Sequence, residues 1–279
     1  VVDRIGRWVD FKGAYKTMDK DYMESVWWAF KELYDKGKIY EGEKVLMYCT
    51  LDATPLSKAE VTMDAGAYQD VTDPSVYVKF RLASEEREAV YLLAWTTTPW
   101  TLPANTAVAV NEKLAYVEVE QAGEHLILAK ELLDKVMQDE KHQPLEYTIV
   151  RELKGKELVG KSYEPLLGVD RGENAHKVWS APYVSHEDGT GIVHLAPAYG
   201  EEDFVLAREK GIPVVHTIDE NGIFTESDWA GKNVWEINKT IAKDLHERGI
   251  VWKIDYIRHS YPHCHRCGTK LMYRAHPSW

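Results

Sequence analysis

The chain has 279 residues, of which 45 are acidic and 34 basic, so its formal net charge is −11. Hydrophobic residues make up 44% and charged residues 28%, which predicts a folded globular protein of one or two domains and excludes a disordered one. No apolar run is long enough to span a membrane, three cysteines are too few for a disulfide framework, and the acidic excess argues against a protein that coats nucleic acid non-specifically. We therefore expect a cytoplasmic protein with no membrane partner.

The charge is unevenly distributed. Residues 1–50 are neutral overall, residues 51–249 carry a net charge of −15, and residues 250–279 carry +4. The chain starts at Val1 without an initiating Met and ends at Trp279, a large apolar side chain at a terminus. We interpret it as an excised piece of a longer protein.

Hydrophobic periodicity predicts helices and many short strands. A helix is predicted over 19–37, with Asp19 as its N-cap and Gly37 at its end. Strands are predicted at 75–83, 89–96, 106–110, 115–120, 125–129, 146–150, 177–181 and 190–195, and further helices at 129–140, 201–210 and 233–248. Residues 155–175 read as surface connections. Because the strands do not alternate with helices as βαβ units, we expect an α+β fold: a barrel-like, mainly antiparallel sheet with peripheral helices.

The segment Trp95–Asn105 concentrates hydroxyl groups. Four threonines, Thr96, Thr97, Thr98 and Thr101, fall within six residues, and two prolines restrict the backbone around them. Such a rigid, hydroxyl-rich loop after a buried strand can form the polar wall of a ligand pocket. The competing interpretation is a proline-terminated turn at a sheet edge, which fits the same composition.

A second segment, 189–204, reads as a strand, a Pro/Gly loop and the start of a helix. Its carboxylates, Glu201, Glu202 and Asp203, fall in the first helical turn, where the helix dipole alone explains negative charge. His194, near the end of the strand, is more often a structural than a catalytic residue in such a position. Composition alone therefore leaves both readings open here.

The third segment contains Cys264 and Cys267, spaced as half of a zinc site. The remaining cysteine, Cys49, is followed three residues later by Asp52, whose carboxylate is an allowed zinc ligand. His263 and His265 compete for the fourth position, and reduced thiols without a metal are the alternative.

Taken together, the segments resemble the editing region of isoleucyl-tRNA synthetases, a family of class I aminoacyl-tRNA synthetases. The string Thr96–Asn105 and the segment Gly189–Phe204 look like the two signature peptides of the editing (CP1) domain. Residues 3–48 and 261–279 look like the catalytic-domain stretches that flank this insertion. The resemblance covers essentially the whole chain and implies an editing domain over 49–257, with 1–48 and 258–279 forming the catalytic-domain edge and the zinc stem.

The resemblance also implies a reaction and residue roles. The domain would hydrolyse valine from mischarged tRNA(Ile), with Thr97 and Thr98 beside the ester and Thr96, Trp100 and Asn105 in the surrounding wall and floor. His194 would be the steric sieve, and Asp203 would bind the substrate's α-ammonium. Direct attack by water is expected, because no catalytic triad or activated cysteine is evident.

Cofactor expectations follow from the same resemblance. Editing itself would need none, and zinc would be structural at Cys49, Cys264 and Cys267, with Asp52 as the fourth ligand where the family often has a cysteine. The family's two ATP-site motifs are absent, so ATP and magnesium would serve only the full-length enzyme. The partners would be the tRNA(Ile) 3′ end and the rest of the catalytic domain. The alternatives are a non-catalytic tRNA-binding module with a vestigial pocket and a zinc-dependent hydrolase.

Overall fold

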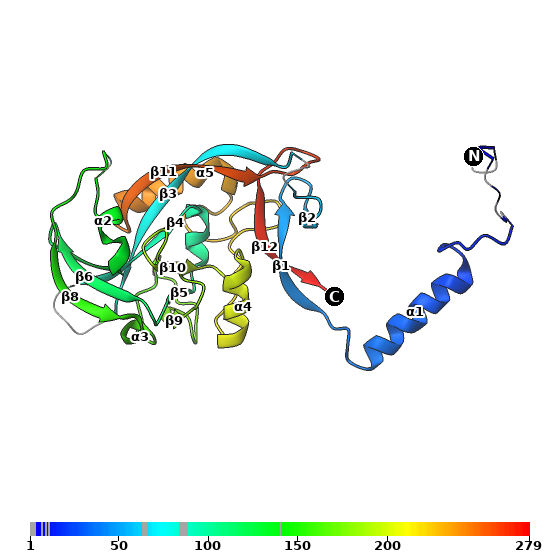
Figure 1. Ribbon diagram of the computed structural model, residues 1–279, viewed down its shortest axis with the longest axis horizontal. Helices are drawn as coiled ribbons and strands as arrows, with labels where there is room; N and C mark the ends of the chain where they lie inside the picture. Colours follow the sequence, from blue (N-terminus) through cyan, green and yellow to red (C-terminus); the bar gives the residue numbers. More distant parts are fainter. Residues whose placement is uncertain are drawn as a thin grey trace. The chain divides into compact units, whose positions relative to one another are not determined.

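The computed structural model describes residues 4–6, 8, 10, 12–62, 66–83, 89–139 and 141–279 (Figure 1). Val1 and Glu140, the last residue of the predicted helix 129–140, lie outside the described residues. The chain divides into two compact units, one formed by Val1–Glu43 with Pro277–Trp279 and the other by Lys44–His276. No helix in the described ranges is long and apolar enough to cross a membrane.

The first unit contains one long helix, α1 (Lys20–Asp35), as predicted. Asp19 holds the N-cap position without a side-chain capping bond, and Gly37 ends the helix with a positive φ of 64°. No residue of α1 is buried, and its aromatic side chains, including Trp27, Trp28 and Phe30, are exposed. Val26, Phe30 and Leu33 have the spacing of one apolar helix face, and all three are exposed.

The second unit is built on a six-stranded sheet. Its order is β11-β3-β4-β7-β6-β8, and every neighbouring pair is antiparallel except β4 and β7. The strands are β3 (Tyr68–Arg81), β4 (Val90–Thr96), β6 (Ala115–Gln121), β7 (Glu124–Ala129), β8 (Thr148–Lys154) and β11 (Val251–Pro262). Helix α5 (Val234–Glu247), capped by the side chain of Asn233, packs on β3 and β11 (Figure 1).

Two smaller sheets lie wholly or mostly in this unit. One has the order β10-β5-β9, from β5 (Ala107–Val110), β9 (Lys177–Ser180) and β10 (Ile192–Leu195). Leu206 and Ala207 of helix α4 (Glu201–Lys210) pack in its apolar cluster. The other has the order β12-β1-β2, from β1 (Gly42–Cys49), β2 (Thr54–Leu56) and β12 (Leu271–Ser278). Short helices η2 (Pro99–Ala104), η3 (Lys130–Leu132), α2 (Leu133–Val136) and α3 (Gly155–Leu158) connect these strands.

The expected barrel-like sheet is wrong for the part of the chain that the structure describes. The strands form three open sheets, and β11 and β8 are the two edges of the largest one. The mixed α/β composition and the mainly antiparallel pairing are as predicted. The expected single helix over 129–140 is also wrong, because its place is taken by η3 and α2, each one turn long and anchored by buried Leu132, Leu133 and Val136.

Candidate functional site

The threonine-rich segment leaves β4 at Thr96 and enters η2, a 3-10 helix whose six residues are all buried. Pro99 occupies the first position of η2, where its fixed φ and missing N–H fit a helix start. Trp100 points into the core, 3% exposed, with its ring 5.3 Å from that of Tyr199 and 5.9 Å from that of Trp235. The packing of Trp100 therefore holds the hydroxyl-rich segment against the body of the unit.

The hydroxyl groups of this segment form a continuous chain. The backbone N–H of Thr98 donates to Oγ1 of Thr96 at 3.2 Å, and the two Oγ1 atoms lie 3.1 Å apart. Oγ1 of Thr98 lies 3.3 Å from Oγ1 of Thr101, and Thr101 donates to the carbonyl of Thr98 at 2.8 Å. The segment is thus held in one conformation by its own side chains.

His194 connects this chain to the second sequence segment. Its Nε2 lies 2.9 Å from Oγ1 of Thr101, and its Nδ1 lies 2.9 Å from Nδ2 of Asn105. The ring is 7% exposed, and burial lowers the pKa of His194 to about 3, so it is neutral near pH 7. Because both nitrogens are engaged and protonation is unfavourable, the geometry gives His194 no role as a general base.

Asp203 lies in the first turn of α4, as predicted. Its Oδ2 accepts a hydrogen bond from the backbone N–H of Ala196 at 3.0 Å, two residues beyond His194. Burial raises the pKa of Asp203 to about 6, and the nearby Glu202 charge adds to this. A half-buried carboxylate of this kind can attract a cationic group of a ligand.

A cavity of about 320 Å³ separates the two segments. Trp95, Thr96 and Thr97 line it on one side, and residues from the turn before β10 and the start of that strand line it on the other. These residues are Ser185, Asp188, Gly189, Thr190, Gly191, Ile192 and Val193. Gly191 must be glycine, because it has a φ of 70° and a Cβ there would lie 2.3 Å from Cβ of Ala129.

The predicted site residues thus fall into three groups. Thr96 and Thr97 line the cavity, while Thr98, Asn105 and His194 belong to the hydrogen-bonded network behind it. Asp203 and the core residue Trp100 are not among the residues that line the cavity. The network also includes Tyr163, whose hydroxyl donates to Oδ1 of Asn105 at 2.6 Å. No local pattern around Tyr163 pointed to this contact.

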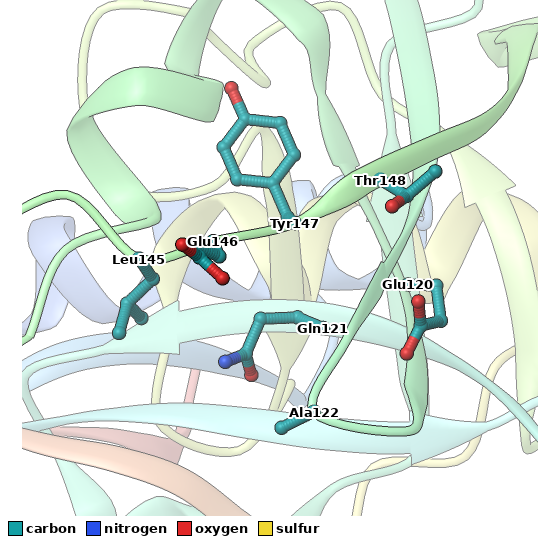
Figure 2. A pocket seen from close by; sticks show the side chains of 7 residues that line it. All are labelled: Glu120, Gln121, Ala122, Leu145, Glu146, Tyr147 and Thr148. Atoms are coloured by element: carbon teal, nitrogen blue, oxygen red, sulfur yellow. The ribbon is translucent and has the colours of Figure 1, made fainter.

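A larger pocket of about 740 Å³ opens elsewhere on the second unit (Figure 2). It lies between the β6–β7 turn and the segment that leads into β8, and it is lined by Glu120, Gln121, Ala122, Leu145, Glu146, Tyr147 and Thr148. None of the predicted site residues lines it, and Figure 2 shows mostly separate polar side chains at its rim. Size alone therefore does not make it the functional site.

The predicted metal ligands come together from distant parts of the sequence. The ligand atoms of Cys49, Asp52, Cys264 and Cys267 all lie within 4.8 Å of one another. Sγ of Cys49 lies 3.4 Å from Sγ of Cys267, and Sγ of Cys264 lies 3.2 Å from Oδ2 of Asp52. Three thiols and one carboxylate at these distances fit the tetrahedral, sulfur-rich coordination of zinc.

The competing histidines are not part of this group. His263 is engaged with the carbonyl of Tyr261, 2.9 Å from its Nδ1, and His265 is not in the cluster. Among the described residues of the stem, Cys49, Asp52, Cys264 and Cys267 are therefore the candidate metal ligands.

Comparisons with known proteins identify the family of the chain. Residues 1–279 match the family model described as tRNA synthetases class I (I, L, M and V). The chain is 45% identical to the isoleucine–tRNA ligase of Bdellovibrio bacteriovorus over 100% of its length, and 44% identical to that of Clostridium novyi over 99%. It spans only 26% of the length of each of these relatives.

Solved structures show the same fold at low identity. GlLeuRS-CP1 has a TM-score of 0.55 at 14% identity, covering 65% of this chain and 99% of that one. The editing domain of the P. knowlesi cytosolic leucyl-tRNA synthetase has a TM-score of 0.51 at 11% identity, covering 66% and 97%. About two thirds of the chain therefore has the fold of these CP1 and editing domains.

Proposed function

The chain belongs to the class I tRNA synthetases, and from this premise we propose that it is the editing part of an isoleucyl enzyme. Its reaction is the hydrolysis of the ester that joins valine to tRNA(Ile). The observation that carries the proposal is the cavity between the two motif segments, which Thr96 and Thr97 line, together with the half-buried carboxylate of Asp203 in the second segment, which is hydrogen-bonded to the backbone N–H of Ala196.

A physical need supports such a reaction. A synthetic pocket gains too little from one methylene group to exclude valine, and the isoleucine–valine pair is the standard example of this limit. A second site that admits the smaller side chain and rejects the larger one removes the error. The cavity of about 320 Å³ lies at the small end of the range for ligand pockets, in keeping with this task.

The residues divide the work as follows. Thr97 and Thr98 place the terminal adenosine, the ester and the attacking water, and Thr96 supports this wall. Asp203 pairs with the α-ammonium of the aminoacyl group. His194, neutral and tied at both ring nitrogens, limits the size of the amino-acid side chain. Asn105 and Trp100 hold the floor and the wall in place.

The charge distribution fits this substrate. Residues 51–249 carry the net charge of −15, which suits an ammonium-bearing end better than a long phosphate track. The tRNA would be held chiefly by the remainder of the synthetase, and ATP and magnesium would serve that remainder. Zinc, held by Cys49, Asp52, Cys264 and Cys267, would stabilise the stem and supply no chemistry to the cavity.

The test measures deacylation of valyl-tRNA(Ile) and isoleucyl-tRNA(Ile) by the wild type and by Asp203→Ala. Preferential hydrolysis of the valyl ester, lost in the variant, is expected. Equal rates for both proteins on the valyl ester would remove Asp203 from the site. The alternative, a non-catalytic module, predicts no hydrolysis and no binding of a non-hydrolysable valyl-adenosine analogue. A zinc-dependent hydrolase predicts that chelation abolishes the activity.

A further inference from the structure

Behind the cavity, a buried chain of hydrogen bonds runs from Tyr163 through Asn105 to His194 and Thr101. We propose that Asn105 and Tyr163 are positioning residues that fix the tautomer and the orientation of the His194 ring. The inference rests on the proposed function, because it explains how a histidine can serve as a rigid size filter. It assigns to Asn105 a task other than ligand contact and introduces Tyr163, which lies outside both sequence segments.

Asn105 determines which ring nitrogen of His194 carries the proton. Nδ2 of Asn105 lies 2.8 Å from the carbonyl of Ala107 and 2.9 Å from Nδ1 of His194. An amide NH₂ group has two hydrogens and can only donate; these two short contacts use them, and a third acceptor, the carbonyl of Leu195, lies farther away at 3.4 Å. Nδ1 of His194 must therefore accept, which places the proton of the neutral ring on Nε2.

On the other side of the His194 ring, Thr101 offers a hydrogen-bond acceptor to Nε2. Its hydroxyl hydrogen is committed to the carbonyl of Thr98, at 2.8 Å, so its oxygen is left to accept. Nε2 of His194 lies 2.9 Å from that oxygen and donates to it. The two contacts of the ring therefore require the same tautomer, and the ring cannot turn without losing both.

Tyr163 fixes the amide of Asn105 in the orientation that this requires. Its hydroxyl donates to Oδ1 of Asn105 at 2.6 Å, and the side chain is only 2% exposed. The ring packs edge-on against Phe80 at 5.2 Å, and its backbone N–H donates to the carbonyl of His176 at 2.9 Å. Loss of this hydroxyl leaves a buried acceptor without a donor and weakens the preference for one amide orientation, which the carbonyl of Ala107 then has to maintain without it.

The experiment reads the tautomer directly. In the full chain labelled with ¹⁵N-histidine, long-range ¹H–¹⁵N correlation spectra distinguish Nδ1 from Nε2, and the His194 signals are those missing from His194→Gln. We expect an unprotonated Nδ1 and a protonated Nε2 in the wild type. In Tyr163→Phe, the two ¹⁵N shifts should move toward each other as both tautomers become populated. Discrimination between the valyl and isoleucyl esters should fall about tenfold.

Tyr48→Phe is the matched control. Tyr48 is also a buried core tyrosine, 1% exposed, but its hydroxyl has no hydrogen-bond partner among the residues that the structure describes. This variant should retain the wild-type His194 signals and the wild-type discrimination. If Tyr163→Phe does not fold, Asn105→Asp tests the same step. Its carboxylate accepts, so the proton should move to Nδ1 of His194.

The outcomes separate this inference from the function it rests on. Wild-type His194 shifts in Tyr163→Phe, or a protonated Nδ1 in the wild type, would overturn the positioning role. A changed tautomer together with reduced discrimination supports both the positioning and the filter. A changed tautomer with full discrimination supports the positioning and contradicts the filter assigned to His194. A normal tautomer in a wild type without hydrolytic activity supports the positioning and contradicts the proposed function alone.

Discussion

The carboxylate of Asp203 accepts a hydrogen bond from the backbone N–H of Ala196 at 3.0 Å, yet its pKa is raised to about 6. A hydrogen bond of this kind stabilises the ionised form and lowers the pKa, so the burial of the carboxylate outweighs it. The close fit extends to the backbone, since a Cβ at Gly200 would lie 2.7 Å from Oδ2 of Asp203. The protein therefore maintains a carboxylate where its charge is unfavourable for folding.

Asp203→Asn should stabilise the fold in a pH-dependent way. The pKa of Asp203 in the folded state, about 6, lies above the ordinary value of 3.8. The carboxylate therefore lowers the free energy of unfolding of the wild type as the pH rises through this range to above 6, and has no such effect below 3.8. Above pH 7 the variant should gain about 2–3 kcal/mol in free energy of unfolding, and near pH 4 almost nothing. Urea unfolding between pH 4 and pH 8 measures this.

Asp228→Asn is the control for that measurement. Its side chain is 71% exposed and pairs with Arg248 at the surface, so its effect should be small and nearly independent of pH. A stability gain in Asp203→Asn that is equal at all pH values would contradict the burial argument. A gain in stability accompanied by loss of deacylation is the trade-off expected of a functional carboxylate.

His194→Ala should lose selectivity while retaining hydrolysis. Removal of the ring opens space beside the site and leaves the threonine wall in place, so isoleucyl-tRNA(Ile) should become a substrate, with at least about tenfold faster hydrolysis than in the wild type. The two deacylation rates measure it, with exposed His142 as the site of a matched His142→Ala control. Unchanged rejection of the isoleucyl ester would show that another residue sets the size limit.

Thr97→Phe should block the cavity. An aromatic ring takes up much of the space of about 320 Å³, so binding of a non-hydrolysable valyl-adenosine analogue should be lost while circular dichroism and the unfolding midpoint change little. Calorimetric titration measures the binding. Thr148→Phe, in the larger pocket of Figure 2, should leave binding of the analogue unchanged. Loss of binding in Thr148→Phe alone would move the site to that pocket.

The cysteine cluster should bind one zinc ion per chain. We expect Asp52→Ala to weaken zinc binding and Asp52→Cys to strengthen it, because thiolate is the softer ligand. Elemental analysis of protein dialysed against zinc buffers measures occupancy. Chelation should lower the unfolding midpoint and leave deacylation unchanged. Equal zinc occupancy in Asp52→Ala would remove the carboxylate from the ligand set, and lost activity on chelation would favour a zinc-dependent hydrolase.

The periodicity of the sequence predicted the strands that carry the site. Strand β4 is apolar up to Thr96 and strand β10 is apolar except for His194, and both lie within a residue or two of the predicted ranges. Strands β1, β2, β11 and β12 were not predicted. β11 shows why, since its residues are mostly half-buried and it ends in Pro262, so the pattern carries little contrast.

The site itself was predictable only where its residues are close in sequence. The threonine hydroxyls form their network within six residues, whereas the contact of Tyr163 with Asn105 spans 58 residues and depends on tertiary contacts such as the bridge between Tyr163 and Leu82. The metal cluster was found despite its separation because the CxxC spacing is itself informative. The burial of Trp100 was not foreseen, because an aromatic side chain beside a pocket motif fits the core and the ligand equally well.

Strands β1 and β12 are neighbours in one sheet, so the chain enters and leaves the second unit along a single two-stranded neck. Because the two strands lie side by side, a protein that carries this unit is interrupted only over a short distance. Such a short interruption adds little loop-closure entropy to the folding of that protein. A unit attached in this way can be gained, lost or exchanged without redesign of the protein that carries it. Proofreading would then be a detachable property, inherited through one pair of strands.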